Sequence, residues 1–242
     1  MQRYFLKSED FMNNIILGDD VFHISRVMRN KVKDRIEVCA NSKAYIVEIT
    51  SISSDSVTFD IVEEIVTKTS KKPKITLIQG LAKGDKLDDI IKHSTELGVD
   101  TIILLQMKRS IVKFESNKLE SKLIRFNKIA KEAAEQAHRN SIPEVMILSD
   151  LNNLNFDKAF KLLLDEEEAK KIDGRMLSSI SFDGYEEVVF IIGPEGGIDE
   201  KERVLYTNNG FIPISIGDNI LRTETASLAF LAMLNYIFMK GN

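Results

Sequence analysis

The sequence predicts an α/β protein in which a mostly parallel sheet follows a small β-barrel. After Pro73, strand-like and helix-like segments alternate, the order that builds a parallel sheet. Before it, short and closely spaced strand-like segments are typical of a small barrel or sandwich. The chain has 242 residues, of which 43% are hydrophobic. That length suits one large domain, or one ordinary domain with a smaller companion.

The first part of the chain reads mainly as strands. Its β-branched, partly alternating runs predict strands over residues 35–40, 45–52 and 57–62. A serine-rich turn at 53–56 separates the last two, and residues 23–28 could form a short helix. Residues 67–73 are polar and end in proline, so we expect a linker there.

The second part carries the alternating pattern. Leu87, Ile90, Ile91 and Leu97 follow helical spacing, and Gly98 stands where that helix would stop. The expected strands cover residues 75–78, 101–107, 144–148, 188–192 and 212–216. The expected helices cover residues 87–97, 119–137, 200–208 and a last segment from 223. A short acidic run at 166–168 is expected to be solvated.

Composition excludes several classes of protein. A single cysteine, Cys39, excludes an intramolecular disulfide and a multi-cysteine metal site, and the three histidines lie far apart. The N-terminus lacks the apolar core of a signal peptide. The most apolar stretch, 226–238, is shorter than the roughly 20 residues that span a bilayer. We therefore expect a cytoplasmic protein without a membrane partner or a metal.

The net charge of −4 argues against a generally basic coating protein, yet the charge is unevenly distributed. Residues 1–74 carry 12 Lys and Arg against 11 Asp and Glu, whereas the remainder carries 21 against 26. One basic cluster spans residues 26–35 and another spans 68–74. Such clusters can contact phosphates, although a solvated positive face explains them equally well.

Ligands of open α/β folds bind beyond the carboxyl ends of the strands, so the loops there are the candidate sites. The loop 79–86 is not a phosphate-binding Walker sequence, and the chain has no GxGxxG motif. The loop 191–199 is more specific: an apolar strand runs into Gly193-Pro194-Glu195-Gly196-Gly197, whose glycines allow close backbone approach. An ordinary glycine-rich turn is the alternative.

Two further segments could carry chemistry. The loop 216–226 follows the next strand, and Thr223 could cap the last helix with Glu224 in its first turn. The other is the end of the long helix, where Arg139 and Asn140 could project toward a substrate. The alternatives are a well-capped helix in the first case and a surface helix end in the second.

Together these segments resemble the bacterial 16S rRNA uracil-N3 methyltransferases of the SPOUT superfamily. The likeness covers nearly the whole chain and is carried by residues 1–5, 23–29, 81–86, 95–99, 109–110, 193–197 and 221–226. The two glycine-loop motifs, in that order and spacing, are its most specific part. Two positions depart from the family: His138 replaces a small residue, often glycine, and Asn219 replaces a residue that is commonly basic.

The resemblance implies a PUA-like β-barrel that holds RNA over residues 1–73. It implies a SPOUT methyltransferase domain with a deep trefoil knot and a mostly parallel sheet over 74–242. It further implies S-adenosylmethionine as cofactor, without a metal, and a homodimer whose active sites draw on both subunits. The implied target is N3 of one uridine, expected at position 1498, in 16S rRNA. We expect the enzyme to meet this RNA within the assembled small ribosomal subunit.

The resemblance also assigns residue roles. The expected catalytic residues are Arg222, Glu224 and Arg139. The expected cofactor-binding residues are Ile192, Gly193, Pro194, Glu195, Gly196, Gly197, Ile216, Gly217, Ile220, Leu221, Arg222, Thr223, Thr225 and Ala226. The expected RNA-binding residues are Arg3, Arg26, Arg29, Lys31, Lys33, Lys83, Lys86 and Arg109. Glu224 could orient Arg222 or accept the N3 proton.

Three alternatives remain at this point: methylation of another RNA, a non-catalytic RNA-binding protein of the same fold, and an α/β enzyme that acts on a small molecule. Failure to bind S-adenosylmethionine would favour the second alternative. Activity that survives removal of residues 1–74 would favour the third.

Overall fold

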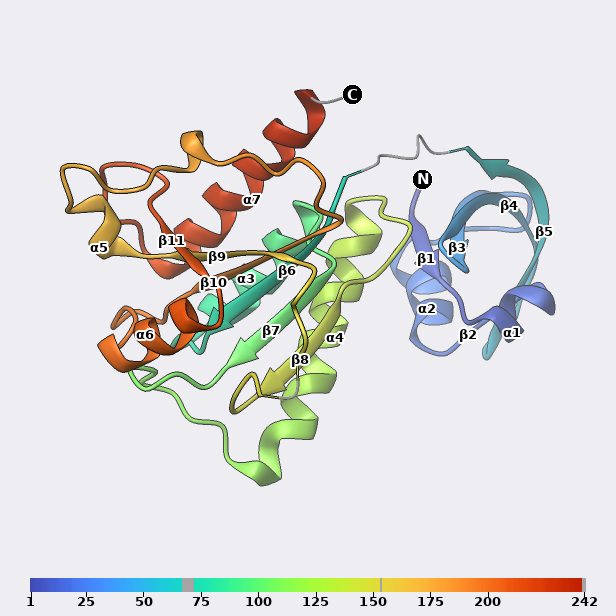
Figure 1. Cartoon of the computed structure of the whole chain (residues 1–242). Helices are drawn as coiled ribbons and strands as arrows, with labels where there is room; N and C mark the ends of the chain where they lie inside the picture. Colours follow the sequence, from blue (N-terminus) through green and yellow to red (C-terminus); the bar gives the residue numbers. More distant parts are fainter. Residues whose placement is uncertain (67–71, 153, 241–242) are drawn as a thin grey trace. The chain divides into compact units, whose positions relative to one another are not determined.

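The computed structural model describes residues 1–66, 72–152 and 154–240 (Figure 1). The chain divides into two compact units, one of residues 1–70 with 134–142, the other of residues 71–133 with 143–242. The division is not a single cut in the sequence, because the end of the long helix belongs to the first unit. Most of the expected linker at 67–73 lies outside the described residues.

The first unit is a curled five-stranded sheet. In chain order its elements are β1 (Arg3–Phe5), α1 (Ser8–Met12), β2 (Ile15–Leu17), α2 (Asp19–Phe22), the π-helical turn η1 (His23–Val27), β3 (Arg35–Ala40), β4 (Lys43–Ile52) and β5 (Ser56–Ile65). The strand order is β1-β3-β4-β5-β2, and only β1 pairs in parallel, with Arg3 opposite Glu37. The strands expected within 35–65 are present. The pattern did not reveal the three-residue strands β1 and β2.

Alternating apolar residues build the core of the first unit. Val47 and Ile49 on β4, and Val57 and Phe59 on β5, are buried and pack with Tyr4 of β1. A half-buried strand places every second side chain on the same face, which explains the alternation read from the sequence.

The second unit holds a six-stranded sheet whose strands all run in parallel. Its elements are β6 (Lys74–Gly80), α3 (Lys86–Glu96), β7 (Thr101–Leu105), η2 (Ser116–Lys118), α4 (Leu119–Gln136), β8 (Glu144–Leu148), β9 (Phe160–Leu164), α5 (Glu166–Ala169), η3 (Leu177–Ser179), β10 (Glu187–Ile192), α6 (Glu200–Asn208), β11 (Ile212–Ile214) and α7 (Thr223–Lys240). The strand order is β11-β9-β10-β6-β7-β8. The sequence missed only β9 among these strands.

Both faces of this sheet are covered. Val188 and Phe190 of β10 join the apolar cluster that includes residues of α3 and α7, whereas Val189 and Ile191 join the cluster that contains Tyr206 of α6. Figure 1 shows α7 and α6 on opposite sides of the sheet. Strands buried on both faces read as continuous apolar runs, as residues 188–192 do. The carboxyl ends of β9, β10 and β11 therefore meet at one edge, where a site can form.

No helix in the described part of the chain has the length and apolar character needed to cross a membrane.

Candidate functional site

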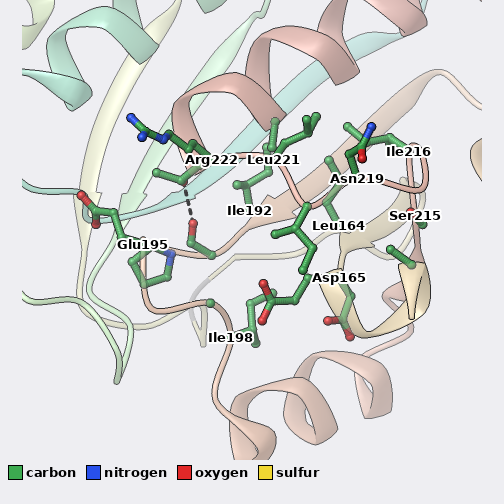
Figure 2. A pocket seen from close by; sticks show the side chains of 18 of the residues that line it. Leu164, Asp165, Ile192, Glu195, Ile198, Ser215, Ile216, Asn219, Leu221 and Arg222 are labelled. Atoms are coloured by element: carbon green, nitrogen blue, oxygen red, sulfur yellow. Dashed lines mark hydrogen bonds between the residues drawn. The ribbon is translucent and has the colours of Figure 1, made fainter. Parts of the chain in front are cut away.

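A pocket of about 380 Å³ lies at the carboxyl ends of β9, β10 and β11 (Figure 2). Leu164, Ile192 and Ile214, the last residues of those strands, form part of its wall. Ile216, Ile220 and Leu221 add apolar surface. Figure 2 shows Glu195 and Arg222 at one side of the pocket and Asp165 and Asn219 toward the other. Its volume and mixed lining are typical of a small-molecule site.

The pocket gathers most of the predicted cofactor residues. Those that line it are Ile192, Gly193, Pro194, Glu195, Gly197, Ile216, Ile220, Leu221, Arg222, Thr223 and Ala226. Gly196, Gly217 and Thr225 belong to the same loops but do not line the pocket. The pocket wall also contains residues that the sequence did not single out for the cofactor: Lys86, Leu164, Asp165, Glu166, Ala169, Ile198, Ile214, Ser215 and Asn219.

Buried hydrogen bonds join the end of β6, the loop after β10 and the start of α7 at the pocket. Gln79 Nε2, near the end of β6, donates to Thr223 Oγ1 at 2.7 Å. Thr223 Oγ1, at the start of α7, donates to the carbonyl oxygen of Gly193 at 2.7 Å. The second bond is drawn as a dashed line in Figure 2. We call these three residues the Gln79–Thr223–Gly193 relay. It holds the two glycine loops together.

Close packing explains the glycine at position 193. A Cβ atom there would lie 2.8 Å from Ile198 Cγ1 and 3.0 Å from the Gly197 carbonyl carbon, too close for either. Gly197 adopts a φ of +71°, a left-handed conformation that favours glycine. The Gly197 amide donates to the carbonyl oxygen of Pro194 at 2.9 Å, so the loop 193–197 is a folded-back turn.

Lys86 links two carboxylates of the site. Its Nζ lies 3.1 Å from Glu195 Oε1 and 3.5 Å from Glu224 Oε2. Glu195 Oε1 also accepts a hydrogen bond from the backbone amide of Lys83 at 2.9 Å. Partial burial raises the pKa of Glu195, but these hydrogen bonds and the Lys86 charge outweigh burial and hold the pKa below its ordinary value. Glu195 is thus kept as an anion.

The missed acidic residues follow β9: Asp165 caps the N-terminus of α5, and Glu166 is the first residue of that helix. Asp165 is buried, accepts a hydrogen bond from the backbone amide of Glu167, and binds the Arg203 guanidinium, whose Nη2 donates to Oδ1 at 2.9 Å. Glu166 opens the acidic run that the sequence predicted to be solvated; it is exposed, and it also lines the pocket. A recognisable β9 in the sequence would have placed both carboxylates at a strand end.

The predicted RNA-binding residues fall into two groups: the first unit carries Arg3, Arg26, Arg29, Lys31 and Lys33, and the second carries Lys83, Lys86 and Arg109. Arg26, Arg29, Lys31 and Lys33 are exposed on the first unit. Arg29 and Lys33 adopt left-handed backbone angles, with φ of +56° and +76°, in a turn that Asp34 holds by accepting from the Lys31 amide at 2.8 Å. The turn therefore presents several cations outward.

The structure corrects the expectation for Arg3. Its side chain is only 3% exposed, and its Nε donates to Glu37 Oε2 at 2.9 Å. A guanidinium enclosed in this way does not reach a phosphate on the surface, so Arg3 has a role inside the first unit. Lys83 and Arg109 are exposed, and Arg109 Nη1 donates to the carbonyl oxygen of Gly196 at 3.1 Å.

Comparison with known proteins identifies the family. The profile of the RNA methyltransferase domain matches residues 69–235, and that of the RNA methyltransferase PUA domain matches residues 16–62. The chain belongs to this RNA methyltransferase family. The resemblance inferred from the sequence motifs is thereby confirmed, as is the α/β fold with a PUA-like first unit.

Named members of this RNA methyltransferase family align with the chain over nearly its full length. The chain is 36% identical to "Ribosomal RNA small subunit methyltransferase E" of Bacillus subtilis, over 98% of this chain and 96% of the relative. It is 30% identical to the protein of that name from Mesomycoplasma hyopneumoniae, over 96% and 97%. A crystal structure of the Neisseria gonorrhoeae protein of that name, bound to S-adenosyl methionine, aligns with a TM-score of 0.85 at 28% identity, over 98% of both chains.

Proposed function

We propose that this methyltransferase transfers a methyl group from S-adenosylmethionine to N3 of a uridine in 16S rRNA of the small ribosomal subunit, expected at position 1498. The observation that carries the proposal is the pocket at the ends of β9, β10 and β11, built from both glycine loops. The names of the relatives support the RNA substrate, and the gonococcal structure supports the cofactor.

The residues of the pocket fit this cofactor. Apolar side chains from Leu164, Ile192 and Leu221 suit a flat adenine ring, and Gly193 and Gly197 line the pocket without side chains. Asp165, Glu166 and Glu195 give the lining more acidic than basic groups, which complements a sulfonium cation. When bound, S-adenosylmethionine supplies an electrophilic methyl group at its sulfonium.

The chain's own residues would prepare the acceptor. Arg222 lines the pocket beside the second glycine loop, where its guanidinium would stabilise the uracil anion and favour loss of the N3 proton. Glu224 faces the Lys86 ammonium, which supports an orienting role over a proton-accepting one. The uridine must first leave its base stack, because N3 is inaccessible in a duplex. Holding donor and acceptor in line would then supply much of the acceleration.

The RNA would be held by the exposed cations of the first unit, the turn that carries Arg26, Arg29, Lys31 and Lys33. We further propose the roles of residues 1–73 as an RNA-holding domain and 74–242 as a knotted catalytic domain, in a cytoplasmic protein. Arg139 would complete a catalytic site in a homodimer. Exposed Met233, Tyr236 and Met239 on α7 support association, which light scattering would measure as a dimer mass.

Nucleoside mass spectrometry tests the reaction. Small-subunit rRNA from cells without the gene should lack one 3-methyluridine, and purified protein with S-adenosylmethionine should restore it on small subunits isolated from those cells. Unchanged 3-methyluridine after deletion would contradict the proposed target. Methylation of a different RNA would point to the first alternative, and failure to bind S-adenosylmethionine in calorimetry would point to a non-catalytic protein.

Lys86 and Lys83 should behave differently despite their proximity. Lys86→Met removes the cation between Glu195 and Glu224, so we expect about tenfold weaker binding of S-adenosylmethionine, measured by calorimetry. Lys83→Met keeps the backbone amide that binds Glu195, so donor binding should stay within about twofold while RNA affinity falls. Equal loss of RNA affinity and unchanged donor affinity in both variants would show that Lys86 acts on RNA, as the sequence predicted.

A further inference from the structure

The segment after α4 ends that helix in a Schellman turn, which lies wholly within the first unit. The His138 amide donates to the Glu135 carbonyl at 3.2 Å, and the Arg139 amide donates to the Ala134 carbonyl at 2.9 Å. This pair of bonds requires a left-handed residue between helix and exit, a position that glycine usually fills. Here His138 fills it with a φ of +51°. A side chain in that conformation is strained unless its surroundings hold it.

Glu37 of β3 holds the histidine. Its Oε2 lies 2.9 Å from His138 Nδ1 and also receives the Arg3 guanidinium, with Nε and Nη2 each at 2.9 Å. Burial raises the pKa of Glu37, but the hydrogen bonds from His138 and Arg3 outweigh it and leave the pKa below its ordinary value. The carboxylate is therefore charged and shared between two partners. We call Arg3, Glu37 and His138 the Arg3 clamp.

The Arg3 clamp also fixes the backbone around Arg139. Arg3 Nη1 donates to the carbonyl of His138 at 2.6 Å and to that of Arg139 at 2.9 Å. It reaches Asn140 Oδ1 at 2.7 Å, while Cys39 Sγ donates to the Asn140 carbonyl at 3.2 Å. A cation beside the last carbonyls of a helix is also favoured by the helix dipole. Both peptide groups that flank the Arg139 Cα are thus involved in hydrogen bonds.

We propose that the Arg3 clamp positions Arg139, so that Arg3, Glu37 and His138 act on the methyl-transfer reaction through the direction in which the Arg139 side chain leaves the turn. The proposal rests on the proposed function, in which Arg139 contacts the acceptor. The clamp's contacts converge on residues 138–140, the segment that carries Arg139. The same contacts explain why histidine is tolerated where the family commonly has a small residue. Glu37 binds the imidazole of His138, which stands where glycine would have only a hydrogen atom.

A double-mutant cycle on the full chain tests the proposal. Glu37→Gln should lower kcat on undermethylated small subunits about tenfold, because a small misplacement of a reacting group costs that much or more. The KM for S-adenosylmethionine should stay unchanged. In an Arg139→Ala background the same substitution should cause no further loss, since coupled residues are non-additive. Glu64→Gln, which breaks the exposed pair with Lys43 in the same unit, is the matched control and should leave kcat within about twofold.

Glycine rescue separates positioning from general stability. The double variant Glu37→Gln/His138→Gly should recover most of kcat, because glycine adopts the left-handed angle without a partner, whereas Glu37→Gln/His138→Ala should not. All variants are assayed well below their melting temperatures. Hydrogen exchange of residues 134–142, followed by mass spectrometry, should accelerate in Glu37→Gln and return toward the parent rate in the glycine double variant.

The outcomes are distinct. Unchanged exchange in Glu37→Gln would overturn the clamp, and an equal fall of kcat with and without Arg139 would overturn its positioning role. If Arg139→Ala alone keeps full kcat, the positioning role fails while methylation by the parent chain still stands. If the parent chain methylates no RNA, the proposed function and the positioning role both fail, and the exchange data alone still report on the clamp.

Discussion

Arg222→Ala should reduce the rate of methyl transfer at saturating donor by about 100- to 1000-fold, because removal of a group that stabilises developing negative charge typically has that effect. The dissociation constant of S-adenosylmethionine should change less than kcat, since the backbone of both glycine loops remains in place. Single-turnover transfer of a radiolabelled methyl group measures the first quantity, and calorimetry the second.

Two further variants define this result for Arg222. Arg222→Lys keeps the charge but not the planar fork of donors, so its rate should lie between those of the parent and the alanine variant. Arg125→Ala removes an exposed arginine that pairs with Asp88 away from the pocket, and it should retain full rate. A full rate in Arg222→Ala at saturating donor would contradict the catalytic assignment.

We expect Thr223→Val to lower the free energy of unfolding substantially. Valine keeps the shape of threonine but removes the hydroxyl of the Gln79–Thr223–Gly193 relay, so the buried carbonyl of Gly193 loses its donor. An unpaired buried polar group costs roughly 1–3 kcal/mol. We therefore expect the free energy of unfolding in urea to fall by about 2–3 kcal/mol, once the lost bond from Gln79 is included.

Thr223→Ser supplies the matched control for that variant. Serine keeps the hydroxyl and lacks only a methyl group, so most of the stability and the affinity for S-adenosylmethionine should be retained, whereas the valine variant should lose both. Equal unfolding free energies for valine and serine would show that the relay adds little.

The sequence predicted the site where local pattern is strong. An apolar strand leads into the glycine-rich loop at Gly193, and another precedes the loop that ends at Thr223. The structure brings both loops to one pocket. The strand β9 was not predicted because the segment 160–164 is short and is followed directly by an acidic stretch. Asp165 and Glu166, which line the pocket, were therefore missed as well. Tertiary pairing with β10 and β11 makes this segment a strand, and no local periodicity contains that information.

Arg3 and His138 show a second limit of the sequence. A basic residue near the start of the chain predicts a surface cation, but its partners Glu37 and residues 138–140 lie far along the sequence. The departure at position 138 was visible as a histidine in place of a small residue. Its meaning required a backbone angle and a neighbouring carboxylate, and both arise only on folding.

The strand order of the second unit bears on the time at which the protein becomes active during synthesis. β6 pairs with β10, whose Glu187 lies opposite Lys74, and the pocket is completed only by residues up to Ala226. A chain that emerges from the ribosome with its N-terminus first therefore makes the strands of the first unit early, and a complete donor pocket only near the end of translation. Incomplete chains would carry the exposed cations of the first unit without the means to bind a methyl donor.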